Sequence, residues 1–375
     1  MVEARHWLAL ARTPGSRATL GALLDELGTP EALFTAKPAR LRGLGDEARA
    51  WLAAPDTALL DADQQWLDRS GALLVVRGAP DYPPQLALAP DPPLVLFVRG
   101  DPGLLALPQL AIVGSRNPSP QGARDAEAFA AHLARAGLAI VSGLALGIDA
   151  AAHRGTLAAG GTTIAVCGTG LDRVYPRANH ALATEIVARG ALVSEFPPGT
   201  PALKQNFPQR NRTIAGLSLG TLVVEAAAVS GSLITARCAS EAGREVFAIP
   251  GSIHNPLAKG CHRLIREGAK LVEKGDDVLE ELAPLLGSLA RELAAPSAAP
   301  RTTRAPVALE IDDAETKRVL AEVEWAPTAF DLIVERSRLP TPVVSSILLM
   351  LELQGRVAAA AGGRYVRINT REDQR

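Results

Sequence analysis

The sequence of 375 residues has few cysteines, no long apolar run and almost no net charge. Its three cysteines show no C-x-x-C spacing, and an odd number cannot pair completely, which predicts a reducing, cytoplasmic environment. The formal net charge of −1 argues against a generally basic nucleic-acid coat but is compatible with a local basic pocket. No apolar run approaches the roughly 18 residues of a membrane helix, and no signal peptide is expected. The sequence therefore predicts no membrane partner.

Several enzyme and metal motifs are absent or stand in the wrong context. Residues 114–122 lack the G-x-G-x-x-G dinucleotide pattern, and the chain has no Gly-Lys dipeptide, so no P-loop is predicted. Residues 216–220 match G-x-S-x-G, but they precede an expected strand, whereas a nucleophile elbow follows one. The six histidines show no zinc-binding spacing. We expect no catalytic residue, no metal and no cofactor.

The first 68 residues have the pattern of a small helical domain. Apolar residues recur at helical spacing from Leu20 to Leu27, Gly28 ends that helix, and Thr29-Pro30 begins the next. The cluster resembles SAM-like or helix-hairpin-helix modules, which often accompany nucleic-acid proteins. A docking bundle without a ligand is the alternative.

Residues 72–290 alternate between apolar runs and helical segments. The runs are 24 to 30 residues apart, about one βα unit, and begin near Ala111, Ala139, Ile164, Leu192, Leu222 and Val246. Several are apolar throughout, as buried parallel strands are. The expected fold class is α/β, with an extended Rossmann-like, doubly wound, mostly parallel sheet. Ligands should then bind at the carboxyl ends of its strands.

The C-terminal part predicts a linker and a third domain. Residues 291–310 are rich in Ala, Pro and Thr and lack periodicity, which is typical of a linker. In residues 311–370, Thr328 and Thr341 can begin helices and Gly362-Gly363 can turn a hairpin, the order of a winged helix. Its helix after Thr341 has little Lys or Arg. A protein contact is therefore favoured, and a double-stranded DNA contact remains open.

The first strand of the regular alternation delivers Gly114-Ser115-Arg116 to the start of a helix. Backbone N–H groups, the positive helix end and a guanidinium meet there, which predicts an anion site. The alternative is an arginine that pairs with a surface carboxylate.

The second strand ends in another glycine-containing turn, with Ser142, Gly143, Gly147 and Asp149. The two glycines would let a ligand approach the backbone closely. Asp149 lies in the first turn of the next helix, where a carboxylate favours the helix dipole, so it either supports the turn or faces the ligand. His153 is expected to be a hydrogen-bonded partner of this turn.

Later strands also end in turns that suit a ligand. One runs into Glu225, which could accept a sugar hydroxyl or orient an arginine, and hydroxyls then open a helix at residues 230–235. This arrangement fits a phosphate nest. Its candidate residues are Ser230, Gly231, Ser232 and Thr235. Gly251 follows the last strand of the alternation in a further tight turn.

The densest signal is a run of cations, amides and an aromatic ring in residues 204–212, with no acidic residue between Pro201 and Gly220. Cations match phosphates, amides match bases or sugars, and an aromatic face can stack a base. Structural ion pairs and a core phenylalanine are the alternatives. The candidate DNA-binding residues are Lys204, Asn206, Phe207, Arg210, Asn211 and Arg212.

At these residues the sequence resembles the DNA-processing protein A family (DprA, also called Smf). Four segments carry the resemblance in the family's order, and they lie within residues 110–252. In the family, the arginine of the Gly-Ser-Arg turn and the lysine before the aromatic-Pro-x-Arg-Asn-Arg run line the DNA pocket. The resemblance implies these roles for Arg116 and Lys204, and a stacking position for Phe207; Asn211 and Arg212 match the remainder of the motif.

The resemblance implies a homodimeric single-stranded DNA-binding protein without catalytic activity. Such a protein protects incoming DNA during natural transformation and loads the RecA recombinase onto it. The alternative is a nucleotide-binding or nucleotide-hydrolysing enzyme on a Rossmann-like, lysine-decarboxylase-like scaffold, whose usual P-G-G-x-G-T run is missing from this chain. A purely structural adaptor that acts through the winged helix would leave residues 204–212 without a role.

Overall fold

The computed structural model describes residues 2–294, 313–324, 328–353, 356–360 and 364–367. The chain divides into two compact units, Met1–Ala295 and Pro296–Arg375. Within the described residues, every helix is too short or too polar to cross a lipid bilayer.

The first unit contains one mixed sheet whose described strands are β1 (Leu73–Val76), β2 (Val95–Gly100), β3 (Gln109–Val113), β4 (Ala139–Ser142), β5 (Thr163–Cys167), β6 (Ala191–Ser194), β7 (Gly220–Val223), β8 (Glu245–Ala248) and β9 (Lys270–Leu271). Their order is β1-β2-β6-β5-β4-β3-β7-β8-β9. The pairs from β6 to β9 are parallel, and β2 pairs antiparallel with both β1 and β6. The predicted α/β class with a mostly parallel sheet is confirmed.

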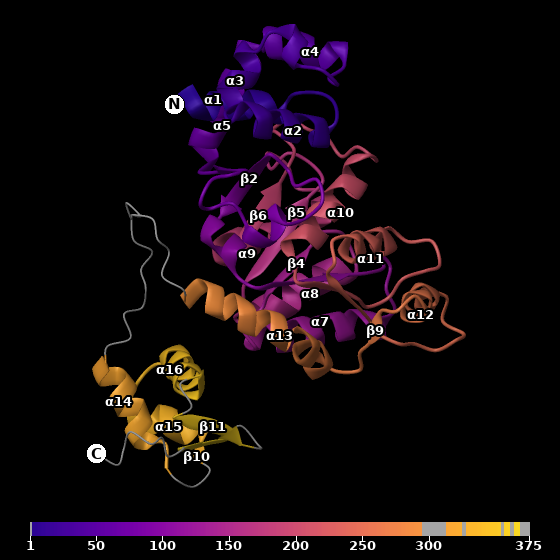
Figure 1. The fold of residues 1–375 in the computed structure, drawn as a ribbon. Helices are drawn as coiled ribbons and strands as arrows, with labels where there is room; N and C mark the ends of the chain where they lie inside the picture. The colour runs from indigo at the N-terminus through magenta and orange to yellow at the C-terminus, as the bar shows by residue number, and fades with distance from the viewer. Residues whose placement is uncertain (1, 295–312, 325–327, 354–355, 361–363, 368–375) are drawn as a thin grey trace. The chain divides into compact units, whose positions relative to one another are not determined.

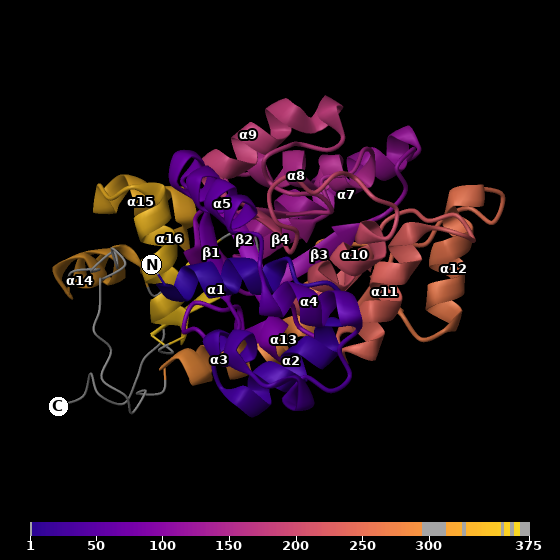
Figure 2. The ribbon, with the colours of Figure 1, turned by 90° about the horizontal axis from the view of Figure 1, so that it is seen from above.

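Helices cover both faces of this sheet, and their bounds are α6 (Pro84–Ala87), α7 (Pro120–Arg135), α8 (Ile148–Ala158), α9 (His180–Arg189), α10 (Asn206–Leu217), α11 (Gly231–Glu241), α12 (Lys259–Arg266) and α13 (Gly275–Ala294). Side chains alternate along β3 because successive residues of a strand point to opposite faces. Leu110 and Ile112 share a core with α7 and α8, whereas Ala111 and Val113 share one with α10 and α11. Figure 2 shows these helix pairs on opposite sides of the sheet, as doubly wound folds require.

Short helices precede the sheet, namely α1 (Val2–Ala11), α2 (Arg17–Leu27), α3 (Pro30–Thr35), α4 (Asp46–Ala53) and α5 (Thr57–Ser70). As the sequence predicts, Gly28 ends α2 in the left-handed conformation and the Thr29 side chain caps α3. These helices gather beside β2 (Figure 1). Leu8 of α1 lies in one hydrophobic cluster with Phe97 of β2 and Ile186 of α9. The helices and the sheet therefore form one compact unit, and a separate domain at residues 1–68 stays a prediction.

The second unit contains α14 (Asp313–Glu322), β10 (Thr328–Ala329), α15 (Phe330–Ser337), α16 (Thr341–Leu353), β11 (Val357–Ala360) and β12 (Arg364–Arg367). Its strands pair antiparallel in the order β10-β12-β11, around a core that includes Val319, Ile333 and Ile347. This is the predicted winged helix, although Thr328 begins a short strand and not a helix. α13 continues to Ala294, so the first residues of the predicted linker 291–310 are helical, and its other residues lie outside the described ones.

Candidate nucleic-acid interface

A cavity of about 630 Å³ is lined mainly by residues that follow β3, β4, β5, β6 and β7. β3 lies between β4 and β7, so the strand order reverses there, and doubly wound sheets bind ligands at such points. The cavity brings together many of the predicted site residues, namely Gly114, Arg116, Asp149, Lys204, Phe207, Arg210, Asn211, Ser230, Gly231, Ser232 and Thr235. We call it the cationic cavity, after Arg116, Lys204 and Arg210 in this lining.

Arg116 and Lys204 are the exposed cations of the cationic cavity. In the part of the chain that the structure describes, neither has a hydrogen-bond or ion-pair partner, and the Arg116 guanidinium carbon lies 5.5 Å from the centroid of the Phe207 ring. The turn before Arg116 is held at both sides: the Ser115 N–H donates to the Glu225 carbonyl (2.7 Å), and its carbonyl accepts from the Ile148 N–H (3.0 Å). A guanidinium is therefore presented from a fixed turn with its donors available.

Two aromatic rings line the same cavity. Phe207 is half-buried at the start of α10, and its ring centroid lies 5.8 Å from that of Tyr175 at an interplanar angle of 43°. The Tyr175 side chain comes from the loop after β5 and is 49% exposed. Sequence reasoning missed Tyr175, although an aromatic between Arg173 and Arg177 after a predicted strand is a signal for a nucleic-acid site.

Arg210 lines the cavity but is committed to protein partners. Its side chain is buried, and its Nη1 donates to the carbonyl oxygens of Gly143 and of Val166, the latter at 2.7 Å. Its Nε donates to Oδ1 of Asn211 (3.2 Å), whose amide donates to the Gly231 carbonyl (3.2 Å). Arg210 was predicted as a DNA-binding residue, and its geometry is that of a group that ties β4, β5 and α10 together.

Asp149 is buried near Arg210, and its Oδ2 accepts a hydrogen bond from the Ala145 N–H (3.3 Å). Burial raises the pKa of the Asp149 carboxyl, and the Arg210 guanidinium opposes that rise. The carboxyl supports the turn after β4 and also lines the cavity. The hydrogen bond supports the expectation that Asp149 stabilises the turn, and its place in the cavity lining supports the expectation that it faces a ligand.

The sequence predicts that the glycines after β4 let a ligand approach the backbone. In the structure, other parts of the protein lie against these glycines. A Cβ at Gly143 would collide with the Arg210 guanidinium, and one at Gly147, where φ is +81°, would collide with the carbonyls of Ser115 and Arg116. The backbone at these glycines is closely approached, as predicted, but by the Arg210 side chain and by the turn at residues 115–116. The glycine requirement follows from this packing because any Cβ would push the two turns apart.

The start of α11 forms the remaining wall of the cavity. The Ser230 hydroxyl accepts from the Ser232 N–H (3.3 Å) and lies 2.8 Å from the Ser232 hydroxyl, and Thr235 follows one turn later. A helix N-terminus with hydroxyl groups favours a bound anion. The residues predicted as a phosphate nest therefore face the same cavity as Arg116 and Lys204.

Other predicted site residues do not line the cavity: Ser115, Ser142, Gly143, Asn206, Gly147, Arg212, Glu225 and Gly251. Asn206 is buried, and its amide donates to the carbonyl of Gly168 (3.2 Å). Arg212 lines a separate cavity of about 290 Å³ with Asp91 and Glu241. On α10, residues 207, 211 and 214 share one face at helical spacing, and residue 212 is turned away from it.

Support residues behind the cavity fix its turns. Glu225 accepts from both the N–H (2.8 Å) and the hydroxyl (2.7 Å) of Ser119, the residue that caps α7, so it orients this cap and not an arginine. The Ser142 hydroxyl donates to the Ile112 carbonyl (2.6 Å), and the Gly251 carbonyl accepts from His262 (2.8 Å).

His153 was expected to bond the turn after β4, and this expectation was wrong. Its Nδ1 instead lies 2.6 Å from Oγ1 of Thr163, at the start of β5. The Thr163 hydroxyl donates to the Ile140 carbonyl (2.8 Å), so His153 is the donor to it.

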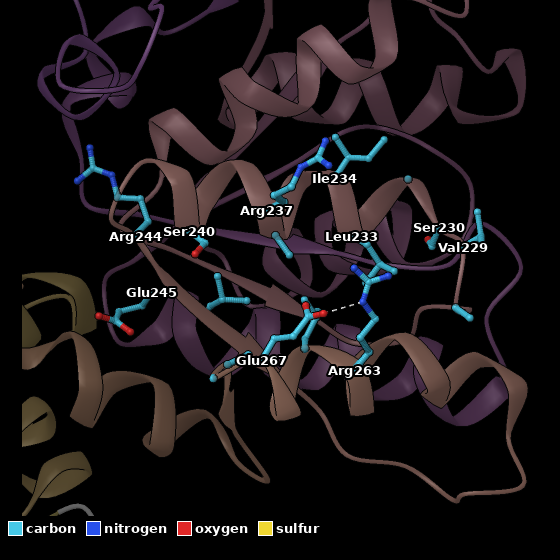
Figure 3. A pocket seen from close by; sticks show the side chains of 17 residues that line it. Val229, Ser230, Leu233, Ile234, Arg237, Ser240, Arg244, Glu245, Arg263 and Glu267 are labelled. Atoms are coloured by element: carbon cyan, nitrogen blue, oxygen red, sulfur yellow. Dashed lines mark hydrogen bonds and ion pairs between the residues drawn. The ribbon is translucent and has the colours of Figure 1, made fainter.

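A second cavity of about 690 Å³ lies between α11 and α12. Figure 3 shows its arginines, and a dashed line joins Arg263 to Glu267, which are 2.9 Å apart. Arg237 pairs with Glu241 (3.6 Å), and Arg244 donates to Oε1 of Gln85 (2.7 Å). Because these arginines already have protein partners, this groove suits phosphates less well than the cationic cavity does.

The mostly parallel sheet, with a cavity at its reversal point, and the C-terminal winged helix define the class: a Rossmann-like protein that carries a winged helix domain. The family model of DNA recombination-mediator protein A matches residues 73–283, and that of the DprA winged helix domain matches residues 296–363. The chain belongs to the DNA recombination-mediator protein A family.

Similarity to individual members extends over most of the chain. The chain is 44% identical to Protein Smf of Escherichia coli over 327 residues, which cover 86% of this chain and 84% of that protein. The solved structure of Streptococcus pneumoniae DprA is similar with a TM-score of 0.65 and 42% identity, over 73% of this chain and 95% of that one. Helicobacter pylori DNA processing protein A, solved to describe its single-stranded DNA binding mode, is similar with a TM-score of 0.52 and 30% identity, over 57% and 96%.

Proposed function

We propose that this protein binds single-stranded DNA in the cationic cavity, without turnover. One observation carries the proposal: Arg116 and Lys204, exposed and without hydrogen-bond or ion-pair partners among the described residues, line the same cavity as the rings of Phe207 and Tyr175. Cations attract phosphates, and exposed rings stack on bases. The bases of a duplex are already stacked on each other, so this combination favours a single strand. The single-stranded DNA binding of the Helicobacter pylori relative supports the same assignment.

The cellular role that we propose follows from the family. The protein protects incoming single-stranded DNA in natural transformation, loads RecA recombinase onto it and acts as a homodimer. Light scattering should then give the mass of two chains. The DNA in the RecA assay is single-stranded and coated with single-strand-binding protein. Adding the protein to RecA and this coated DNA should shorten the lag before RecA hydrolyses ATP. The winged helix is proposed to contact protein or double-stranded DNA, and its deletion should leave oligothymidylate binding intact.

The binding proposal is tested by fluorescence anisotropy with labelled oligothymidylate. Lys204→Gln should weaken binding by at least about tenfold, because a charge-assisted contact to a phosphate is lost. Arg212→Gln is the matched control: it removes one exposed positive charge near Lys204 in sequence, but from a different cavity. Its affinity should stay within about twofold of wild type. Equal losses in both variants would reject the cationic cavity as the binding site.

A parallel hydrolysis assay tests the alternative that the protein is a nucleotide-hydrolysing enzyme. Wild-type protein is incubated with nucleoside monophosphates and with the oligonucleotide, and products are separated by chromatography. Release of base or phosphate at a rate that Asp149→Asn abolishes would replace the binding proposal with a nucleotide-hydrolysing function.

A further inference from the structure

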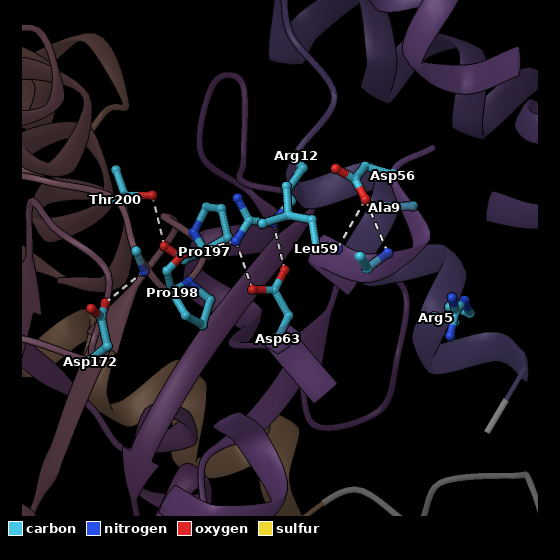
Figure 4. A network of polar contacts seen from close by, with 12 residues as sticks. Arg5, Ala9, Arg12, Asp56, Leu59, Asp63, Asp172, Pro197, Pro198 and Thr200 are labelled. Atoms are coloured by element: carbon cyan, nitrogen blue, oxygen red, sulfur yellow. Dashed lines mark hydrogen bonds and ion pairs between the residues drawn. The ribbon is translucent and has the colours of Figure 1, made fainter. Parts of the chain in front are cut away.

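Two arginines reach from the N-terminal helices to residues 195–206, the segment that leads into the cationic cavity. Arg12 follows α1, and its guanidinium donates to both carboxylate oxygens of Asp63 on α5, at 2.5 and 2.6 Å. The same guanidinium donates to the carbonyl of Pro198 at 2.8 Å. Figure 4 shows Arg12 between Asp63 and Pro198. One side chain thus joins two N-terminal helices to a loop that lies 186 residues away in sequence.

The second arginine acts on α10 through a buried carboxylate. Arg17, the first residue of α2, pairs with Glu195, whose side chain is only 3% exposed. Glu195 also accepts hydrogen bonds from the Thr213 hydroxyl and from the Gln209 amide, the latter at 3.2 Å. Thr213 and Gln209 belong to α10, the helix that presents Phe207 to the cavity.

The loop that carries Tyr175 holds the same segment from another direction. Oδ1 of Asp172 accepts from the Gly199 N–H (2.9 Å), and the Gly170 N–H donates to the Thr200 carbonyl (3.1 Å). Residues 197–200 therefore have hydrogen bonds both to Arg12 and to the loop after β5. Lys204 follows four residues later and is exposed.

We propose that Arg12 and Arg17 are positioning residues for the cationic cavity: the N-terminal helices hold Lys204 and Phe207 where single-stranded DNA meets them. The inference rests on the proposed function. Neither arginine lines the cavity, and each side chain is 15% exposed and engaged with a buried carboxylate. Their effect on DNA therefore runs through the segment 195–206. A segment that is already ordered loses less conformational freedom when the ligand binds.

The first test uses hydrogen exchange on the free, full-length protein. The N–H groups of Gly199, Thr200 and Asn206 are hydrogen-bonded, so peptides that cover 197–206 should be protected in wild type. Arg12→Gln should raise their exchange rate by about tenfold. Arg5→Gln is the matched control, since Arg5 forms an exposed ion pair with Asp61 inside the N-terminal helices. Unchanged exchange at 197–206 in Arg12→Gln overturns the proposal.

The second test couples the arginine to the cavity. Arg12→Gln should weaken oligothymidylate binding roughly tenfold, whereas Arg5→Gln should not. In a Lys204→Gln/Phe207→Leu background, measured at low salt, the loss from Arg12→Gln should shrink to within about twofold, since coupled residues are non-additive. A loss that persists undiminished in this background means that Arg12 acts independently of these two residues, and overturns the proposal.

Further variants keep the tests decisive if Arg12→Gln does not fold. Arg12→Lys keeps a charge opposite Asp63 but lacks the guanidinium fork needed to reach Asp63 and Pro198 together, and should show the same two effects. Arg17→Lys should retain more affinity than Arg17→Gln, because it keeps a cation beside buried Glu195. If wild type itself binds no DNA, the proposed function fails, while the exchange experiment still decides whether Arg12 orders the segment.

Discussion

The salt dependence of DNA binding should separate the two available cations of the cationic cavity from the arginines that have protein partners. For single strands, each neutralised phosphate contributes about 0.7 to the slope of log affinity against log salt concentration. Arg116 and Lys204 are both exposed and have no hydrogen-bond or ion-pair partner among the described residues. Arg116→Gln and Lys204→Gln should therefore each reduce the slope by about 0.7, and the double variant by about 1.4.

The assay is fluorescence anisotropy of labelled oligothymidylate between roughly 50 and 200 mM salt. Over this fourfold range, a slope difference of about 0.7 makes the affinity gap between wild type and a single variant narrow by about 2.6-fold. The affinity gap between wild type and the double variant should narrow by about sevenfold over the same range. Arg212→Gln, which removes a charge from a different cavity, should leave the slope unchanged.

Two results would refute this reasoning. If Arg116→Gln and Lys204→Gln lower affinity by a factor that does not change with salt, their side chains do not neutralise phosphates. If Arg212→Gln changes the slope as much as Lys204→Gln does, the slope reports general surface charge, and the cationic cavity has no special part in it.

Three further predictions concern stacking, stability and pH. Phe207→Leu should lower oligothymidylate affinity by about 1–3 kcal/mol with an unchanged salt slope, because stacking releases no counterion; a changed slope would contradict it. Arg210→Met should lower the free energy of unfolding, measured in urea, by about 2–5 kcal/mol, because the buried carbonyls of Gly143 and Val166 lose their donor. A loss no larger than that of a substitution at an exposed arginine would contradict this prediction. Burial lowers the pKa of His153 to about 3, so the folded state holds it neutral, and the unfolded chain takes up its proton as the pH falls below about 6.5. Between pH 7 and pH 5, His153 should therefore remove about 2 kcal/mol of stability, so wild type should lose about 2 kcal/mol more than His153→Asn, whose amide can still donate to Thr163.

Local pattern was enough to predict the strands β3 to β8 and the turns that follow them. Each apolar run from Ala111 to Val246 forms a strand, because buried parallel strands are continuous in sequence and are bounded by turn residues. The Gly114-Ser115-Arg116 turn could be placed at the ligand edge because the carboxyl ends of parallel strands share one edge.

The roles of individual side chains in the candidate site needed the fold. In residues 204–212, Lys204, Arg210 and Arg212 look alike as cations in the sequence. In the structure, Lys204 is exposed in the cationic cavity, Arg210 bonds buried carbonyls, and Arg212 lines another cavity. Two features make this difference: the helical rotation of α10, and the carbonyls of Gly143, just after β4, and of Val166 in β5.

The sequence by itself determined the fold class, the family and the segments that meet at the edge of the sheet, because those depend on local periodicity and on motifs. The tertiary structure alone decided that Tyr175 stands beside Phe207, and that Arg12 holds the carbonyl of Pro198. Both contacts join residues distant in the chain, 32 positions apart in the first case (207 − 175) and 186 in the second. No local pattern encodes such a distance, since it is set by strand order and by the packing of the N-terminal helices against the sheet.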